Sequence, residues 1–241
     1  SCVAMSAGAE LSEELRALSS PARAASSRWF FKTGPGEYGE GDQFLGVTVP
    51  QTRAATKKYY KELSPQDLEL LLNSKWHEVR LAAVIAMRAQ FEKADERLKT
   101  DLYNLYLSHI GKGINNWDII DISCPHIVGA YLLKKDRRPL YDLAQKDLWH
   151  KRVSIISTFY FLKYDTPIET YKLAEVLVNE QHDLLQKAVG WSLREMGKKD
   201  GQLLRQFLDN YAATMPRTAL RYALEKFSDT EKRKYMNMAK V

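Results

Sequence analysis

The segment Ile114-Asn115-Asn116-Trp117-Asp118-Ile119-Ile120-Asp121 decides the fold, because four other segments of the chain can be laid over it. With Trp117 as the anchor of this segment, successive anchors are 37, 35, 35 and 30 residues apart, and the other four are Arg80, Arg152, Lys187 and Arg217. A period of this length is typical of two-helix, HEAT-like repeats. The sequence therefore predicts an array of stacked helix pairs.

The remaining pattern is helical as well. Apolar residues recur with helical spacing from Ser12 to Phe31, broken at Ser20-Pro21, and again after Pro50 with short connections up to Met238. No alternating strand pattern is sustained. We expect an all-α, right-handed αα superhelical solenoid whose concave face is used for binding. Residues 1–241 would form a single domain, with N-terminal helices and a loop in residues 1–50 and helical repeats in residues 51–241.

Composition limits the possible functions. The chain has 36 basic and 30 acidic residues, a net charge of +6, which would suit a polyanion if the excess lay on one face. Two cysteines, Cys2 and Cys124, form no disulfide framework, and no Cys/His cluster has zinc-ligand spacing. No segment is apolar enough to span a membrane or to serve as a signal peptide. We therefore expect a cytoplasmic protein that binds no metal.

Trp117 and Asp121 are four residues apart, so they share one face of the helix expected from Trp117 to Lys134. A purely structural interpretation is available, because Asn115 or Asn116 can cap a helix, acidic groups favour a first turn and Trp is often buried. Pro125 should kink this helix, since it lacks the backbone N–H.

A glycine-dense stretch, Thr33 to Asp42, precedes the repeats. It is not a phosphate-binding loop, because no Gly-Lys-Ser/Thr follows it and its charge is acidic. We interpret it as a shaped connecting loop.

Equivalent helices of a solenoid line the same surface, which places Trp117 and Asp121 on one surface with Arg152 and Trp191. Basic residues beside aromatics and one carboxylate would suit a groove that holds a polyanion backbone. The alternative is that the arginines at repeat anchors bind carbonyl groups of neighbouring helices.

Three motifs resemble those of the AlkD-type DNA alkylation-repair glycosylase family, which is built from HEAT-like repeats. Trp117-Asp118-Ile-Ile-Asp121 is similar to its Trp-Asp-x-x-Asp motif. Leu148 to Ile156 resembles its segment with an active-site arginine, and Gln186-Lys187-Ala-Val-Gly190-Trp191-Ser-Leu-Arg194-Glu195 resembles a further signature. Phe44-Leu-Gly-Val also matches, and the likeness runs from about Arg28 to Tyr222.

The resemblance implies a DNA glycosylase of base excision repair that hydrolyses the N-glycosidic bond of cationic N3- or N7-alkylated purines in duplex DNA. It implies action without drawing the base into a pocket. We also expect a monomer that needs no cofactor. Asp121 would be the catalytic carboxylate, Trp117 and Trp191 would hold the deoxyribose, and Arg152 would contact the backbone near the lesion. The remaining DNA-binding candidates are Arg80, Lys187, Arg194, Arg217 and Trp29, the last standing where the family often has a Tyr.

The implied chemistry needs only one carboxylate. An alkylated purine already carries positive charge and leaves without a protonating acid, so the carboxylate has to stabilise the developing sugar cation and orient water. Asp118 is therefore expected to be a supporting group of the first turn rather than a partner acid. Two alternatives stay open, namely a non-catalytic HEAT-repeat protein that binds DNA structure or damage, and a protein-binding HEAT scaffold.

Overall fold

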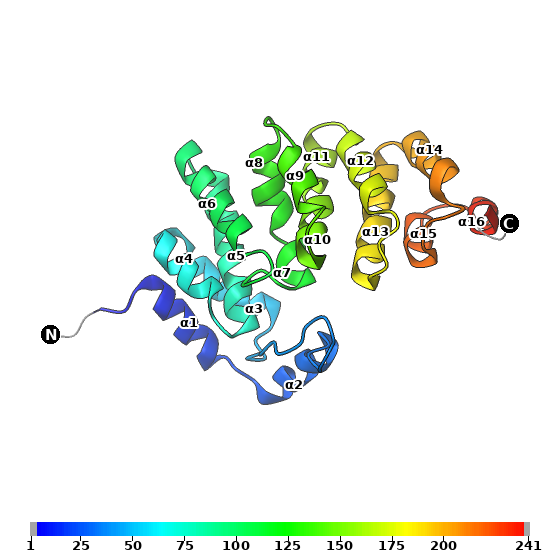
Figure 1. Cartoon of the computed structure of the whole chain (residues 1–241). Helices are drawn as coiled ribbons and strands as arrows, with labels where there is room; N and C mark the ends of the chain where they lie inside the picture. The colour runs from blue at the N-terminus through cyan, green and yellow to red at the C-terminus, as the bar shows by residue number, and fades with distance from the viewer. Residues whose placement is uncertain (1–3, 239–241) are drawn as a thin grey trace. The chain divides into compact units, whose positions relative to one another are not determined.

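The computed structural model describes residues 4–238, and the chain divides into two compact units, Ser1–Ser123 and Cys124–Val241. Cys2 lies outside the described residues. Apart from two isolated β-bridges, the described part of the chain consists of helices and their connections (Figure 1). This confirms the predicted all-α solenoid class. The single domain over residues 1–241 and the right-handed course stay predictions.

The first unit is built around one long helix, α5, against which α3, α4, α6 and α7 pack, while α1 covers α3 and α4. Serine and threonine caps fix where most of these helices begin, and Pro follows the cap in α2, α3 and α4, as the helix-start rules favour. Its elements are α1 (Ala7–Ala17), α2 (Pro21–Phe30), α3 (Val49–Tyr59), the 3₁₀-helix η1 (Tyr60–Glu62), α4 (Pro65–Leu72), α5 (His77–Lys93), α6 (Glu96–His109) and α7 (Trp117–Asp121).

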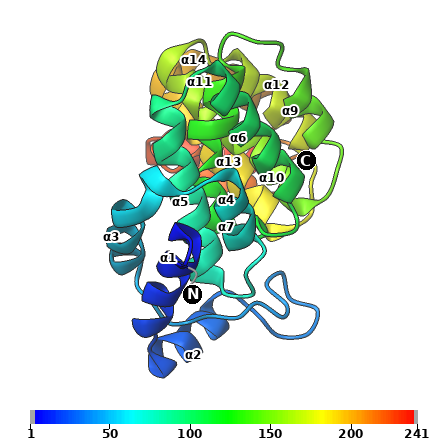
Figure 2. The same ribbon diagram turned by 90° about the vertical axis from the view of Figure 1, so that its left-hand side faces the viewer.

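The Ser-Pro break is where the sequence predicted it, although α1 begins at Ala7, five residues before the predicted start at Ser12. After α2 the chain makes a glycine-rich excursion before α3 begins, which Figure 2 shows as a blue loop beside α2. Gly46 ends this excursion with a φ of +84°, a backbone conformation that favours glycine. A Cβ there would lie 2.1 Å from the Ser20 carbonyl oxygen, so the close packing of this segment on the start of α2 requires glycine.

The second unit is centred on α13, which packs against α10, α11, α12, α14 and α15. Helices α10, α13 and α15 follow one another in a row (Figure 1). Its elements are the π-helix η2 (Pro125–Gly129), α8 (Ala130–Leu132), α9 (Arg138–Leu143), α10 (Leu148–Ile156), α11 (Phe159–Tyr164), α12 (Ile168–Leu177), α13 (Asp183–Lys199), α14 (Gly201–Tyr211), α15 (Arg217–Ala223) and α16 (Asp229–Asn237).

The five repeat anchors all lie near the starts of helices, although at different positions within them. Trp117 and Arg217 are the first residues of α7 and α15, whereas Arg80 is the fourth residue of α5, and Arg152 and Lys187 are the fifth residues of α10 and α13. Within residues 4–238, no helix is both long and apolar enough to cross a membrane.

The predicted continuous helix from Trp117 to Lys134 is wrong. Helix α7 ends at Asp121, and helical structure returns as the π-helix η2 at Pro125. Two local causes explain the break. Pro125 has no N–H to donate to the Asp121 carbonyl, and the Ser123 hydroxyl donates to the Ile119 carbonyl at 2.6 Å, competing with the helix ladder.

Gly190, within the Gly190-Trp191 signature, lets α13 approach α15 closely. A Cβ at this position would lie 2.5 Å from both the carbonyl oxygen of Ala219 and the Cβ of Tyr222. Neither atom is the end of a flexible side chain, so a larger residue would have to push the two helices apart.

We predict that Gly190→Ala lowers the free energy of unfolding by roughly 1–3 kcal/mol, the usual cost of overpacking. Urea denaturation followed by circular dichroism measures it. Gly201→Ala is the matched control, because a Cβ there meets only the end of the Arg205 side chain, at 3.1 Å. Equal stability of the two variants would contradict the close-packing role of Gly190.

Candidate active site

Helix α7 presents one buried and one accessible side. Ile119 and Ile120 are fully buried and fix the helix to the core of the first unit. Asn116, also fully buried, caps the helix by accepting a hydrogen bond from Trp117 N at 2.8 Å. The other side of this single turn carries Trp117, Asp118 and Asp121, each half-buried. The helix therefore displays the aromatic and acidic side chains of the motif while its isoleucines are fixed in the core.

The indole of Trp117 is held by aromatic residues from the end of α2 and from the glycine-rich loop. The ring of Phe31 stacks on it at 5.4 Å between centroids and 29° between planes, and Phe30 meets it edge-on at 6.1 Å. Trp117 Nε1 donates to the hydroxyl of Tyr38 in the loop at 3.3 Å. The N-terminal segment thus forms one wall of the site around Trp117.

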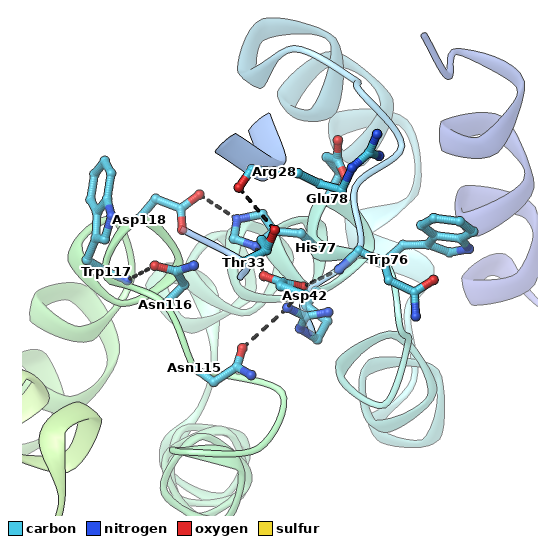
Figure 3. Close-up of polar contacts among 12 residues, drawn as sticks. Arg28, Thr33, Asp42, Trp76, His77, Glu78, Asn115, Asn116, Trp117 and Asp118 are labelled. Atoms are coloured by element: carbon cyan, nitrogen blue, oxygen red, sulfur yellow. Dashed lines mark hydrogen bonds and ion pairs between the residues drawn. The ribbon is translucent and has the colours of Figure 1, made fainter. Parts of the chain in front are cut away.

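His77, the first residue of α5, lies between two carboxylates. Its Nδ1 is 2.7 Å from Asp42 Oδ2, at the end of the loop, and its Nε2 is 2.7 Å from Asp118 Oδ2 in α7. Figure 3 shows Asp118 reaching toward this imidazole while the neighbouring Trp117 lies apart from it. The ring is 2% exposed and stacks on Phe44 at 4.5 Å.

These contacts require a charged histidine. Carboxylate oxygens only accept hydrogen bonds, so both ring nitrogens must carry a proton. Burial favours the neutral imidazole, but the charges and hydrogen bonds of Asp118 and Asp42 outweigh it and raise the pKa of His77 to about 9. Burial likewise favours a neutral Asp42, yet His77 and Arg80 hold the pKa of that carboxyl below its ordinary value of 3.8.

Arg80, the repeat anchor in α5, ties the same segments together. Its Nη2 donates to Asp42 Oδ1 at 2.8 Å and to Asn115 Oδ1 at 3.3 Å. Its other donors reach the carbonyl groups of Gly113, Ser74 and Lys75. Because these bonds use all five N–H groups of the guanidinium, a phosphate contact from Arg80 stays a prediction that would require breaking one of them.

The other arginine anchors also bind carbonyl groups, which is the alternative raised by the sequence. Arg152 is buried and donates to the Leu184 carbonyl at 2.7 Å. Arg217 donates to three carbonyl groups, those of Met236, Ala212 and Met215. Within the second unit these arginines join the start of one helix to the backbone of other helices and of the turn before α15. DNA contacts from them stay predictions.

The remaining predicted residues of the second unit lie on α13. Trp191 is half-buried, with its ring edge-on to Phe159 at 4.7 Å. Lys187 is 41% exposed at its side chain and pairs with Asp183 at 2.9 Å. Arg194 forms an ion pair with Glu225. A shared site of these residues with Trp117 and Asp121 stays a prediction.

Trp29 differs from every other predicted site residue in its exposure. It stands at the end of α2 with 84% of its surface exposed, and Phe30 beside it is 55% exposed. The two adjacent aromatic side chains form a small exposed apolar surface at the end of α2. Trp29 has no hydroxyl where the family often has a Tyr, and the role of Trp29 on DNA stays a prediction.

Sequence patterns did not identify His77, Asp42 or Tyr38 as parts of this site. His77 appeared only as the start of a repeat segment, and the loop was interpreted as a connection. One signal was present, since the repeat alignment sets His77 just before the Arg80 anchor and the glycine-rich loop is acidic. Their meeting depends on tertiary packing between segments more than thirty residues apart.

Fold and site together define a helical-repeat protein with an aromatic and acidic motif displayed on one short helix. The DNA alkylation repair enzyme family matches residues 11–227, and the chain belongs to this family. Membership assigns it to DNA alkylation repair, with DNA as its substrate class.

Comparison with solved structures agrees on the fold. The chain is similar to a structure titled "Predicted DNA alkylation repair enzyme from Enterococcus faecalis", with a TM-score of 0.70 and 16% identity. The match covers 88% of this chain and 97% of that one. No curated protein matches the sequence.

The charged state of His77 predicts how stability depends on pH. The folded protein holds a proton on His77 up to a pKa of about 9, whereas an unfolded histidine loses it near 6.5. The stabilisation is fully present below pH 6.5 and is lost as the pH rises through 9, by an amount on the order of 3 kcal/mol.

Urea denaturation at a series of pH values from 6 to 9.5 measures this dependence. Because Cys and Tyr side chains titrate in the same range, His77→Gln serves as the control and should show a flatter curve. Parallel curves for the two proteins would contradict a charged His77.

Proposed function

We propose that this protein is an alkylpurine DNA glycosylase that hydrolyses the N-glycosidic bond of cationic N3- or N7-alkylated purines in duplex DNA. The observation that carries the proposal is α7, a single helical turn that displays Trp117 and Asp121 on one face beside a wall of aromatic side chains. Family membership supports the substrate class.

The proposed reaction needs no proton donor from the protein. The C1′–N bond of the alkylated nucleotide breaks, and its electron pair neutralises the positive purine, which leaves without a proton donor. Water adds to C1′ and loses a proton, giving an abasic site. Asp121 would stabilise the positive charge that develops on the sugar and orient this water, an electrostatic contribution of the kind that often dominates catalysis.

Trp117 would hold the deoxyribose beside Asp121. Phe31 covers one face of the indole, so the opposite face is the one that a sugar would contact. An aromatic face attracts positive charge, and the attraction strengthens as the sugar becomes cationic. Trp191 is proposed to contact the same sugar, as the family resemblance implies.

Charge on the protein would hold the phosphate backbone. Of the predicted basic residues, Lys187 has its partner in an exposed ion pair, which a phosphate group can replace at little cost, and Arg194 pairs with the exposed Glu225. Arg80, Arg152 and Arg217 are bonded to carbonyl groups, and we propose that they act on DNA chiefly by fixing the helix starts that face it. Exposed Trp29 would meet the duplex as an aromatic contact.

The central test is release of 7-methylguanine from methylated duplex DNA. We predict that the wild type releases the base and that Asp121→Asn lowers the single-turnover rate by roughly a hundredfold or more, because the substitution removes the charge that stabilises the sugar cation. Asp101→Asn, at an exposed position of α6, is the matched control and should behave as the wild type.

Two outcomes would contradict the proposal, namely no release by the wild type or equal release by wild type and Asp121→Asn. DNA binding that weakens with salt, without base release, would select the non-catalytic DNA-binding alternative. Absence of DNA binding would select the protein-binding scaffold.

A second prediction concerns the phosphate contacts. The affinity for duplex DNA should fall as salt rises. If Lys187 binds one phosphate, this fall of log K with log salt should be less steep by about 0.9 in Lys187→Ala. Fluorescence anisotropy with a labelled duplex at several salt concentrations measures the slope. Lys172→Ala, at an exposed position of α12, is the control, and an equal slope for both variants would remove Lys187 from the DNA interface.

A further inference from the structure

Three segments of the first unit meet at His77. His77 is the first residue of α5, and its ring is hydrogen-bonded to Asp42 of the glycine-rich loop and to Asp118 of α7. The backbone joins the same junction, because His77 N donates to the Gln43 carbonyl at 2.8 Å. The loop is therefore fixed to α5 by side chain and backbone together, and α7 is fixed to both through one carboxylate.

The junction is electrically balanced and depends on the imidazolium. His77 and Arg80 supply two positive charges, and Asp42 and Asp118 supply two negative charges. Asp42 is bonded by both cations, whereas Asp118 has one oxygen on His77 and its other oxygen, Oδ1, is buried without a hydrogen bond from the described residues. His77 thus provides the main compensation for a carboxylate that is partly out of water.

Helix α7 is too short to set its own orientation. An isolated helix of five residues would not form, so the direction of its side chains depends on what anchors it. Ile119 and Ile120 anchor its apolar side, and Asp118 anchors its polar side through His77. Trp117 precedes Asp118 directly and Asp121 follows three residues later, so a rotation of this turn would move both.

We propose that His77 and Asp118 are positioning residues of the glycosylase site, and that the glycine-rich loop belongs to the site by holding them. The loop acts at two points, through Asp42 on His77 and through Tyr38 on the indole of Trp117. This inference rests on the proposed function, because it concerns the geometry in which Trp117 and Asp121 meet the sugar.

The competing role for Asp118 is that of a second catalytic carboxylate beside Asp121. Its contacts argue against that role, because one oxygen is engaged by the imidazolium and the other is buried. A group held in this way can orient the helix but has no accessible oxygen with which to attack or deprotonate water.

Substitutions at Asp118 separate the two roles. In Asp118→Asn, a neutral His77 can keep its Nδ1 proton for Asp42 and accept a hydrogen bond at Nε2 from the new amide, so the junction survives with its charges still balanced. In Asp118→Ala no side chain of α7 reaches His77 Nε2. We predict that Asp118→Asn releases 7-methylguanine within about tenfold of the wild-type rate, whereas Asp118→Ala loses roughly a hundredfold, the scale expected for a displaced reacting group.

The measurements are single-turnover rates on methylated duplex and dissociation constants on undamaged duplex. The rate of Asp118→Ala should fall while its affinity for undamaged DNA stays that of Asp101→Ala, the matched control on α6. If Asp118→Ala proves unfolded by circular dichroism, Asp118→Ser replaces it, because its side chain is polar but too short to reach the imidazole.

Nitrogen NMR of the His77 ring gives a readout that does not depend on activity. The ring should be an imidazolium at pH 7.5 in the wild type and a neutral Nδ1–H tautomer in Asp118→Asn. An active wild type in which Asp118→Asn is as slow as Asp121→Asn, or in which Asp118→Ala keeps the full rate, would overturn the positioning role alone. No base release by the wild type would overturn the proposed function and this inference with it, even with the expected NMR result.

Discussion

A buried positive charge on His77 is the constraint on which the first unit's site depends. An imidazolium removed from water is costly unless its charge is compensated at close range, and here two carboxylates at 2.7 Å supply that compensation. Each carboxylate comes from a different segment of the chain. The electrostatic requirement of one side chain is therefore also the reason why a loop and a short helix are fixed to the start of α5.

The arginines at the repeat anchors also use charged side chains to fix separate segments of the chain to one another. Arg80, Arg152 and Arg217 each lie near the start of a helix, and each donates to at least one backbone carbonyl group near an end of another helix or in a connection. Helix ends and turns leave carbonyl groups without helical partners, and a guanidinium can satisfy several of them at once. A basic residue recurring at the repeat period is thus first a structural feature, and any role in binding DNA is added to it.

The fold could be predicted from the sequence because its causes are local and repeated. Helical periodicity, the Ser-Pro start of α2 and the recurrence of the anchors depend on residues close together in the chain, and Pro125 marked the place where the helix after Trp117 breaks. The extent of that break was not predicted, since the back-bonding hydroxyl of Ser123 has no sequence pattern of its own. The motif also located α7 and its aromatic and acidic side chains. It could not reveal His77, Asp42 or Tyr38 as their supports, because those contacts form only when distant segments pack.

The two aspartates of α7 have different surroundings, and this difference suits them to different roles. Both are half-buried and three residues apart, yet Asp118 is bonded to the imidazolium of His77, whereas Asp121 is the last residue of α7. A carboxylate bound to an imidazolium has its charge neutralised locally, so it stabilises a developing sugar cation poorly. A second acid would in any case have no proton to give to a purine that leaves with its positive charge already in place. A reaction that needs only one carboxylate is therefore compatible with a site in which the other carboxylate holds the polar side of α7, while Ile119 and Ile120 hold its apolar side.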